Sequence, residues 1–77
     1  MMAAYVMIQV GASGGLGDLH RALHAVPGVK TVHLLAGPTD VIAFVEAADT
    51  AALSETLGKI RAVMGVAGTD TRIVLPF

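Results

Sequence analysis

Apolar residues recur along the chain with two different spacings, one typical of strands and one typical of helices, and these spacings predict its secondary structure. Four segments are apolar runs or alternate apolar and polar residues with period two, as strands do: 5–10, 29–36, 41–47 and 69–75. Between them, apolar residues recur every three or four positions, first after Asp18 and again after Asp49, as on one face of an amphipathic helix. The predicted order is therefore β-α-β-β-α-β.

Capping and turn residues set the limits of both predicted helices. The first helix is expected to begin near Asp18, whose carboxylate can cap it, and to stop at Pro27 and Gly28. Asp49 is expected to cap the second helix, and Gly65 to end it, since a glycine with positive φ commonly closes a helix. The apolar stripe of the second helix is predicted at Leu53, Leu57, Ile60 and Met64.

An internal repeat supports this order. The segment Ala-Val-Pro-Gly-Val at residues 25–29 matches Ala-Val-Met-Gly-Val at residues 62–66, and Leu23 matches Ile60 at the same offset. Two β-α-β halves of one design build the ferredoxin-like split fold. The predicted class is therefore α+β, a βαββαβ sandwich with two helices on one face of an antiparallel four-stranded sheet.

The predicted strands are apolar on both faces. In segment 41–47, Ile42 and Phe44 point to one face while Val41, Ala43 and Val45 point to the other. A sheet with one face in water should alternate apolar and polar residues, and two helices can cover only one face. We therefore expect the second face to pack on the sheet of another subunit, which gives at least a dimer.

The composition strengthens the expectation of assembly. The 77 residues suffice for one domain, spanning 1–77, at a size where a single core is only marginally stabilising. Yet 55% of the residues are hydrophobic and only 14% are charged, with a mean hydropathy of +0.73. A monomer this small cannot bury so many apolar side chains.

Charge and composition also limit the function classes. No stretch reaches the roughly 18 apolar residues of a membrane-spanning helix, and no basic segment precedes an apolar run at the start as in a signal peptide. The five basic residues are scattered and the net charge is −1, so no basic stripe is available for nucleic acid. The absence of cysteine excludes disulfides and thiolate metal sites and fits a reducing cytosol. We expect a cytoplasmic protein without direct contact to nucleic acid or membrane.

The strongest candidate site lies at the turn between segments 29–36 and 41–47. The sequence Gly37-Pro38-Thr39-Asp40 predicts a type I turn with a carboxylate at the mouth of an apolar hairpin. A zwitterionic amino acid needs an acceptor for its ammonium group, which Asp40 can supply, and donors for its carboxylate. Turn N–H groups and the hydroxyls of Thr69 and Thr71 can supply those donors. The same residues also suit an ordinary turn and strand, so the pattern alone leaves both readings open.

Other candidate motifs give weaker evidence for a functional site. Residues 11–17 contain four glycines before a helix but no P-loop or dinucleotide-binding motif, which favours a plain flexible connection. His20 and His24 share a helix face and could chelate a metal, but an H-E-x-x-H arrangement is absent. Ser13 and Ser54 have no histidine placed beside them, so a nucleophilic site is not indicated. We expect no metal, no cofactor and no enzyme.

The order of motifs resembles the ligand-binding domain of the Lrp/AsnC family of leucine-responsive, or feast/famine, transcriptional regulators. The resemblance covers residues 5–75 and is carried by Val26-Pro27-Gly28-Val29, by Gly37-Pro38-Thr39-Asp40 and by Thr69-Asp70-Thr71. It implies dimerisation through the sheet, assembly into rings of four or five dimers, and amino-acid binding between dimers near the hairpin. Carried over by position, the effector site would comprise Gly37, Thr39, Asp40, Thr69 and Thr71.

This chain departs from the family pattern in three ways. The position before the acid is often aromatic in the family but is Thr39 here, and residues 11–17 replace a proline-containing loop. The chain also starts at the first strand of the ligand-binding domain, as do the stand-alone versions that lack a helix-turn-helix domain. Such versions are implied to bind an amino acid and to modulate full-length regulators by co-assembly.

Two alternatives to an effector module stay open. The first is a small dimeric αβ-barrel enzyme, with His33 or Asp70 as the acid–base residue and a polar cavity between two sheets. The second is a structural assembly partner that binds no small molecule.

Overall fold

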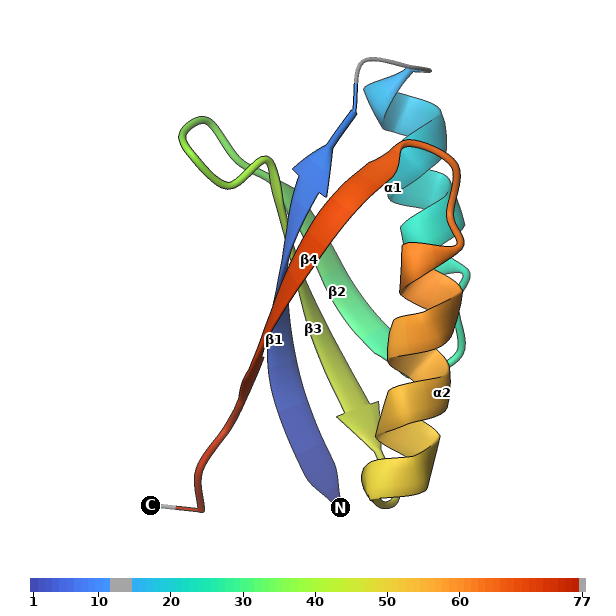
Figure 1. Cartoon of the computed structure of the whole chain (residues 1–77), viewed down its shortest axis with the longest axis vertical. Coiled ribbons are helices and arrows are strands. Elements are labelled where there is room, and N and C mark those ends of the chain that lie inside the picture. Colours follow the sequence, from blue (N-terminus) through green and yellow to red (C-terminus); the bar gives the residue numbers. More distant parts are fainter. Residues whose placement is uncertain (12–14, 77) are drawn as a thin grey trace.

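The computed structural model describes residues 1–11 and 15–76 and confirms the predicted βαββαβ order. The elements are β1 (Met2–Val10), α1 (Leu16–His24), β2 (Val29–Leu34), β3 (Val41–Ala47), α2 (Thr50–Arg61) and β4 (Val66–Ile73). All neighbouring strands are antiparallel, in the order β2-β3-β1-β4. Both helices lie on the same face of the sheet, as Figure 1 shows. In the described part of the chain, neither helix has the length and apolar character needed to cross a membrane.

The core lies between the two helices and the face of the sheet that they cover. Along β3 every second residue is buried, which is the period of a strand with one face against a core. The helices contribute Leu23 and Ile60, both fully buried. The largest fully buried side chains are Ile8, Leu23, Ile60, Val6, Val41 and Val45.

The sequence repeat is also a repeat of backbone conformation. Gly28 and Gly65 have φ of +97° and +101°, a region that favours glycine. In each copy the amide after the glycine donates to the carbonyl three residues earlier, Val29 to Val26 at 3.1 Å and Val66 to Val63 at 3.2 Å. The two helix-to-strand connections are therefore one turn used twice.

The start of α1 differs from the prediction. The helix begins at Leu16, and the extended residue Gly15 takes the N-cap position. Asp18 therefore lies inside the first turn, where a carboxylate is favourable toward the positive end of the helix dipole, and it does not cap the helix. Of the predicted flexible connection 11–17, residues 12–14 lie outside the described residues, and Leu16 and Gly17 belong to the helix.

The start of α2 is as predicted and its end is not. The Asp49 side chain accepts a hydrogen bond from the Ala52 amide at 2.9 Å, which confirms the cap. The helix ends at Arg61 instead of Gly65, because residues after it form the repeated turn. Met64 is consequently 86% exposed and is no part of the buried stripe. Thr56 is buried instead and donates to the Pro27 carbonyl at 3.2 Å.

The open face of the sheet has an apolar centre and polar edges. Strand alternation and register place four large side chains at its centre, two from β1 and two from β3: Tyr5, Met7, Ile42 and Phe44. The rings of Tyr5 and Phe44 lie 5.0 Å apart. The edge strand β4 adds Asp70 and Arg72 opposite Met7 and Tyr5. The predicted apolar second face is therefore confirmed for the two central strands but not for β4.

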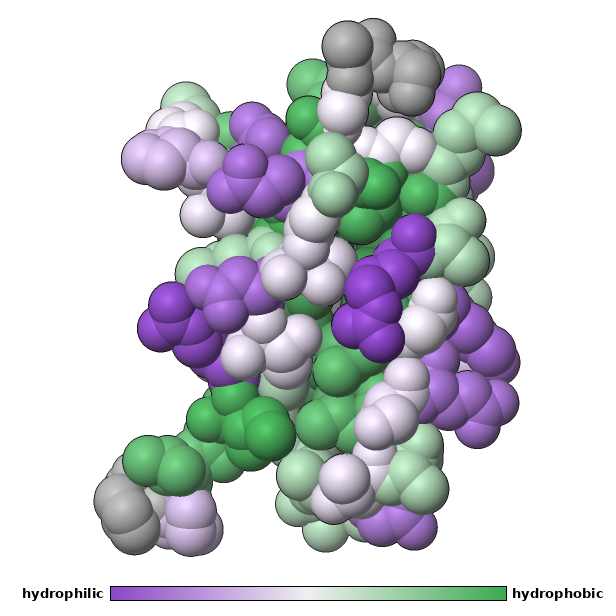
Figure 2. All heavy atoms as spheres, viewed as in Figure 1, coloured by the Kyte–Doolittle hydropathy of each residue, from purple (hydrophilic) through white to green (hydrophobic). Residues whose placement is uncertain are grey.

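The end of β4 and the residues after it lie at the surface, and the Val74 amide still donates to the Ala3 carbonyl at 2.8 Å. Ile73, Val74 and Leu75 are all exposed, and this segment forms the green projection in Figure 2. The strand prediction for 69–75 was therefore displaced, since β4 begins at Val66 and ends at Ile73.

Candidate functional site

The candidate effector loop, residues 35–40, projects beyond the sheet between β2 and β3 (Figure 1). The Leu35 amide closes it by donating to the Asp40 carbonyl at 2.8 Å. The connection is therefore longer than the predicted four-residue turn at residues 37–40, because β2 ends at Leu34 and not at Ala36. Gly37 has a φ of +141°, which side chains with a Cβ rarely adopt.

Asp40 is the anchor of this loop. Its Oδ2 accepts a hydrogen bond from the Val10 amide at the end of β1, at 2.9 Å. Within the described residues, its Oδ1 makes no protein hydrogen bond. The carboxylate is thus half-satisfied and partly buried, and one oxygen keeps its capacity to accept a donor.

A second bond joins the effector loop to β1. Gln9 Nε2 donates to the Pro38 carbonyl at 3.3 Å. Sequence reasoning missed both Gln9 and Val10, although one signal was present. Gln9 is the polar residue near the end of the otherwise apolar strand β1. The strand β3, which pairs with β1, begins directly after Asp40.

The predicted threonine pair lies away from the effector loop. Thr69 and Thr71 are register partners of Ile8 and Val6, so their side chains lie on the helix-covered side of the edge strand β4. Continuing the register of β1 and β3 puts Asp40 beside Gln9, whose partner in β4 is Gly68. Two strand spacings, about 10 Å, therefore separate the backbone of Asp40 from β4. One chain brings together Gly37, Thr39 and Asp40 but not the two threonines.

The proposed acid–base residues of an enzyme are also far apart. His33 and Asp70 lie on the open face in one row, as partners of Ile42 and Met7, but on the two edge strands. Three strand spacings, about 14 Å, separate them. Within a single chain, therefore, only one of the two could act on a given small substrate.

Asp70 is engaged by its neighbour Arg72. The guanidinium donates to both carboxylate oxygens, with the shortest contact 2.9 Å from Nη2 to Oδ2. This hydrogen bonding, with a smaller Coulombic contribution, lowers the pKa of Asp70 below its ordinary value and raises the pKa of Arg72. The pair is exposed and therefore contributes little to stability. It forms a polar edge of the open face.

The histidine pair on α1 is not arranged as a chelate. The rings of His20 and His24 stack 6.2 Å apart at 23°, so their planes do not converge on one metal position. His20 Nε2 lies 3.0 Å from the Val32 carbonyl, to which it donates. Among the described residues, no three His, Asp or Glu side chains lie close enough together to hold a metal ion.

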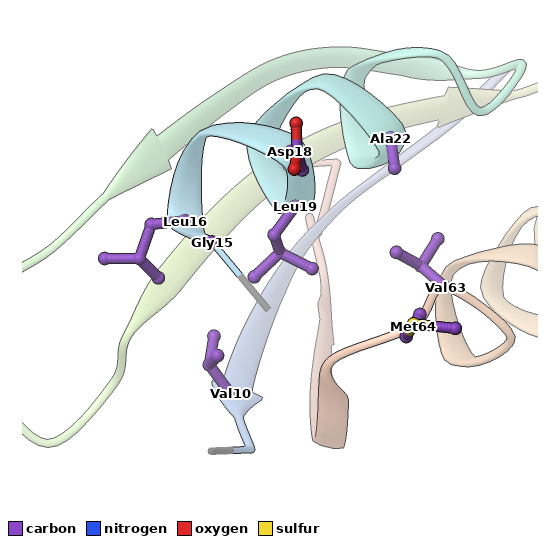
Figure 3. Close-up of a pocket in the computed structure, with 8 residues that line it drawn as sticks. All are labelled: Val10, Gly15, Leu16, Asp18, Leu19, Ala22, Val63 and Met64. Carbon is purple, nitrogen blue, oxygen red and sulfur yellow. The ribbon is translucent and has the colours of Figure 1, made fainter. Parts of the chain in front are cut away.

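A cavity of about 210 Å³ lies between the first turns of α1 and the turn after α2. Figure 3 shows Val10, Leu19 and Val63 converging on it from β1, α1 and that turn. Its lining is mainly apolar, and the exposed Met64 lies at its edge. Val10 therefore contacts the cavity with its side chain and the effector loop with its amide.

Comparison with solved structures shows close likenesses of the whole fold. FFRP-DM1 superposes with a TM-score of 0.87 at 28% identity, covering 97% of this chain and 100% of that chain. The feast or famine regulatory protein of M. tuberculosis, complexed with L-methionine, has a TM-score of 0.83 at 25% identity. That match covers 100% of this chain and 52% of the regulator.

Two curated relatives are longer proteins. The HTH-type transcriptional regulator LysM of Saccharolobus solfataricus is 28% identical over 72 residues, which is 94% of this chain and 51% of the regulator. Homocitrate synthase of Sulfurisphaera tokodaii is 44% identical over 55 residues, which is 71% of this chain and 12% of that protein. This chain thus spans about half of LysM and a small part of the synthase.

The family comparison covers nearly the whole chain. Residues 3–76 match the family model described as Lrp/AsnC ligand binding domain. This range includes all of β3, both helices, β4 and the effector loop. The chain belongs to the Lrp/AsnC ligand-binding domain family.

Proposed function

We propose that this chain binds a free amino acid at the effector loop and acts as a regulatory module. The observation that carries the proposal is the carboxylate of Asp40, which the Val10 amide holds by one oxygen while the other has no donor among residues 1–11 and 15–76. An α-ammonium group is a charge-assisted donor of the right size for that oxygen. The family membership and the L-methionine complex of the M. tuberculosis relative support an amino acid as the ligand.

The other parts of an amino acid also have counterparts around the effector loop. The Thr39 hydroxyl and loop N–H groups can donate to the α-carboxylate. Leu34 and Leu35 are 44% and 43% exposed and offer apolar surface for a ligand side chain. Because Thr69 and Thr71 lie away from the loop in one chain, a site that uses all five predicted residues would form between chains.

Assembly through the open face is the second part of the proposal. Tyr5, Met7, Ile42 and Phe44 form an apolar centre that a second copy would cover, since two sheets pack face to face about 10 Å apart. Dimers would then associate into rings that bring the effector loop of one dimer to a neighbouring one. In this arrangement the module would co-assemble with full-length Lrp/AsnC regulators and alter their response to the amino acid.

The test is calorimetric titration of the protein with each of the twenty amino acids, for wild type and Asp40→Asn. We expect at least one amino acid to bind, and Asp40→Asn to weaken it about 10- to 100-fold, the range of a hydrogen bond to a charged group. Asparagine keeps an acceptor for the Val10 amide but loses the charge that attracts ammonium.

The matched control is Asp18→Asn, the same change at an exposed carboxylate on α1, which should leave the affinity unchanged. Absence of binding by the wild type at millimolar concentrations of all twenty amino acids would contradict the proposal. Equal affinity of wild type and Asp40→Asn would remove Asp40 from the site.

A further inference from the structure

Apolar packing does not hold the effector loop in place. Residues 35–38 are all exposed, and a Cβ placed on Gly37 would meet no atom within 4 Å. Such a loop has few contacts that fix its position, and its local stability is low unless polar contacts hold it. The hydrogen bonds of the loop therefore decide where Thr39 and Asp40 lie.

Both described bonds from the effector loop to the rest of the chain go to consecutive residues of β1. The Val10 amide binds the Asp40 carboxylate, and the Gln9 side chain binds the Pro38 carbonyl. In each case β1 donates and the loop accepts. The closing bond from Leu35 to Asp40 is internal to the loop, whereas the strands of the hairpin are held to β1 by the pairing of β3 with β1, which ends at Val41.

The end of β1, which carries both donors, is itself held by pairing with β4 and by a hydrogen bond to the turn before β4. β1 is a central strand, and Gln9 is paired with Gly68 of β4. Just beyond it, the Gly11 amide donates to the Gly65 carbonyl at 2.8 Å. The register shift between Gln9 and Val10 lies at this end of the strand, where a bulge can redirect donors out of the regular ladder.

We infer that Gln9 is a positioning residue of the amino-acid site, which rests on the proposed function of the effector loop. It acts through the Pro38 carbonyl and so positions the two following residues, Thr39 and Asp40. The Val10 amide attaches the loop at Asp40, at its end next to β3. The added bond from Gln9 gives the loop a second point of attachment.

The test compares Gln9→Met, which keeps the length of the side chain but has no donor, with Gln9→His. At pH 8 a neutral histidine keeps one N–H donor at a similar reach. The readouts are calorimetric affinity for the best-binding amino acid and hydrogen exchange of the Leu35 and Val10 amides, which both donate to Asp40, in the ligand-free protein. We expect Gln9→Met to weaken binding about three- to tenfold, the range of one neutral hydrogen bond, and to speed exchange at both amides.

Gln9→His should restore both quantities to within about twofold of wild type, which a general loss of structure would not allow. Ser54→Met, the same polar-to-methionine change on the exposed surface of α2, should change neither. Unchanged affinity and exchange in Gln9→Met, with a wild type that binds, would overturn the inference and leave the proposed function intact. A wild type that binds no amino acid would overturn both.

Discussion

The same strands form both faces of the sheet, but within one chain the helices bury only one of the two faces. On the covered face, Val6 and Val45 are fully buried under the helices. On the open face, their neighbours Tyr5 and Phe44 pack on each other and stay partly exposed. The covered face has the neutral Thr69 and Thr71 at its β4 edge, whereas the open face is bounded there by the charged Asp70–Arg72 pair.

This difference separates what one chain can stabilise by itself from what needs a partner. The central side chains of the covered face are fully buried, and they supply the hydrophobic stabilisation of the monomer. The open face has the apolar centre and polar rim that are typical of an interface. Mutations on the two faces should therefore affect different quantities, stability on one and assembly on the other.

The largest effect is expected on the covered face. Leu23→Ala removes a fully buried side chain of the core and should lower the free energy of unfolding by about 3 kcal/mol. Leu16→Ala is the matched control, since Leu16 is 53% exposed on the same helix. Urea unfolding would show the difference, and equal losses for the two variants would mean that the covered face is not the core.

A change at the centre of the open face should act on assembly. Ile42→Glu places a charge in the apolar centre, where a second sheet would bury it without a partner, at a cost of several kcal/mol. We expect the variant to sediment as a monomer with the helical circular dichroism of wild type. Ala51→Glu, on the exposed surface of α2, should assemble like wild type. An Ile42→Glu protein that keeps the wild-type mass would place the interface elsewhere.

The smallest effect is expected at the polar edge of the open face. Arg72→Ala removes the donor that lowers the pKa of Asp70, so that pKa should rise toward the ordinary value of about 3.9. Because the folded-state pKa is below the unfolded one, the pair contributes at pH values above about 4. The contribution is lost as the pH falls through the lowered pKa. A carboxyl NMR titration of both proteins measures this shift, and identical titration curves would contradict the assignment.

The sequence predicted best where one residue decides a local structure. The limits of β3 were predicted correctly, because its apolar run is bounded by the turn residues up to Asp40 and by the helix cap at Asp49. The cap at Asp49 was also correct, since a carboxylate at that spacing has one favourable partner, the Ala52 amide. The repeated glycine turn likewise follows from a conformation that glycine favours.

Features that depend on strand register could not be derived from the local sequence. Thr69 and Thr71 alternate with Asp70 and Arg72, and alternation alone does not say which set faces the helices. Pairing with Ile8 and Val6 places the two threonines on the face that the helices cover, and the local sequence does not encode that pairing. The bond between Asp40 and Val10 joins positions 30 residues apart, so a local reading of the turn could not find it.

The central claim is that a second copy covers the open face. The most direct test is the mass of the wild-type protein in solution. Sedimentation equilibrium at several concentrations, with and without an amino-acid mixture, measures it against the chain mass of 7.8 kDa. We predict at least twice the chain mass throughout, rising to a higher even multiple when the amino acid binds at the effector loop. A mass of one chain at every concentration, with Tyr5, Met7, Ile42 and Phe44 left exposed to water, would contradict the account.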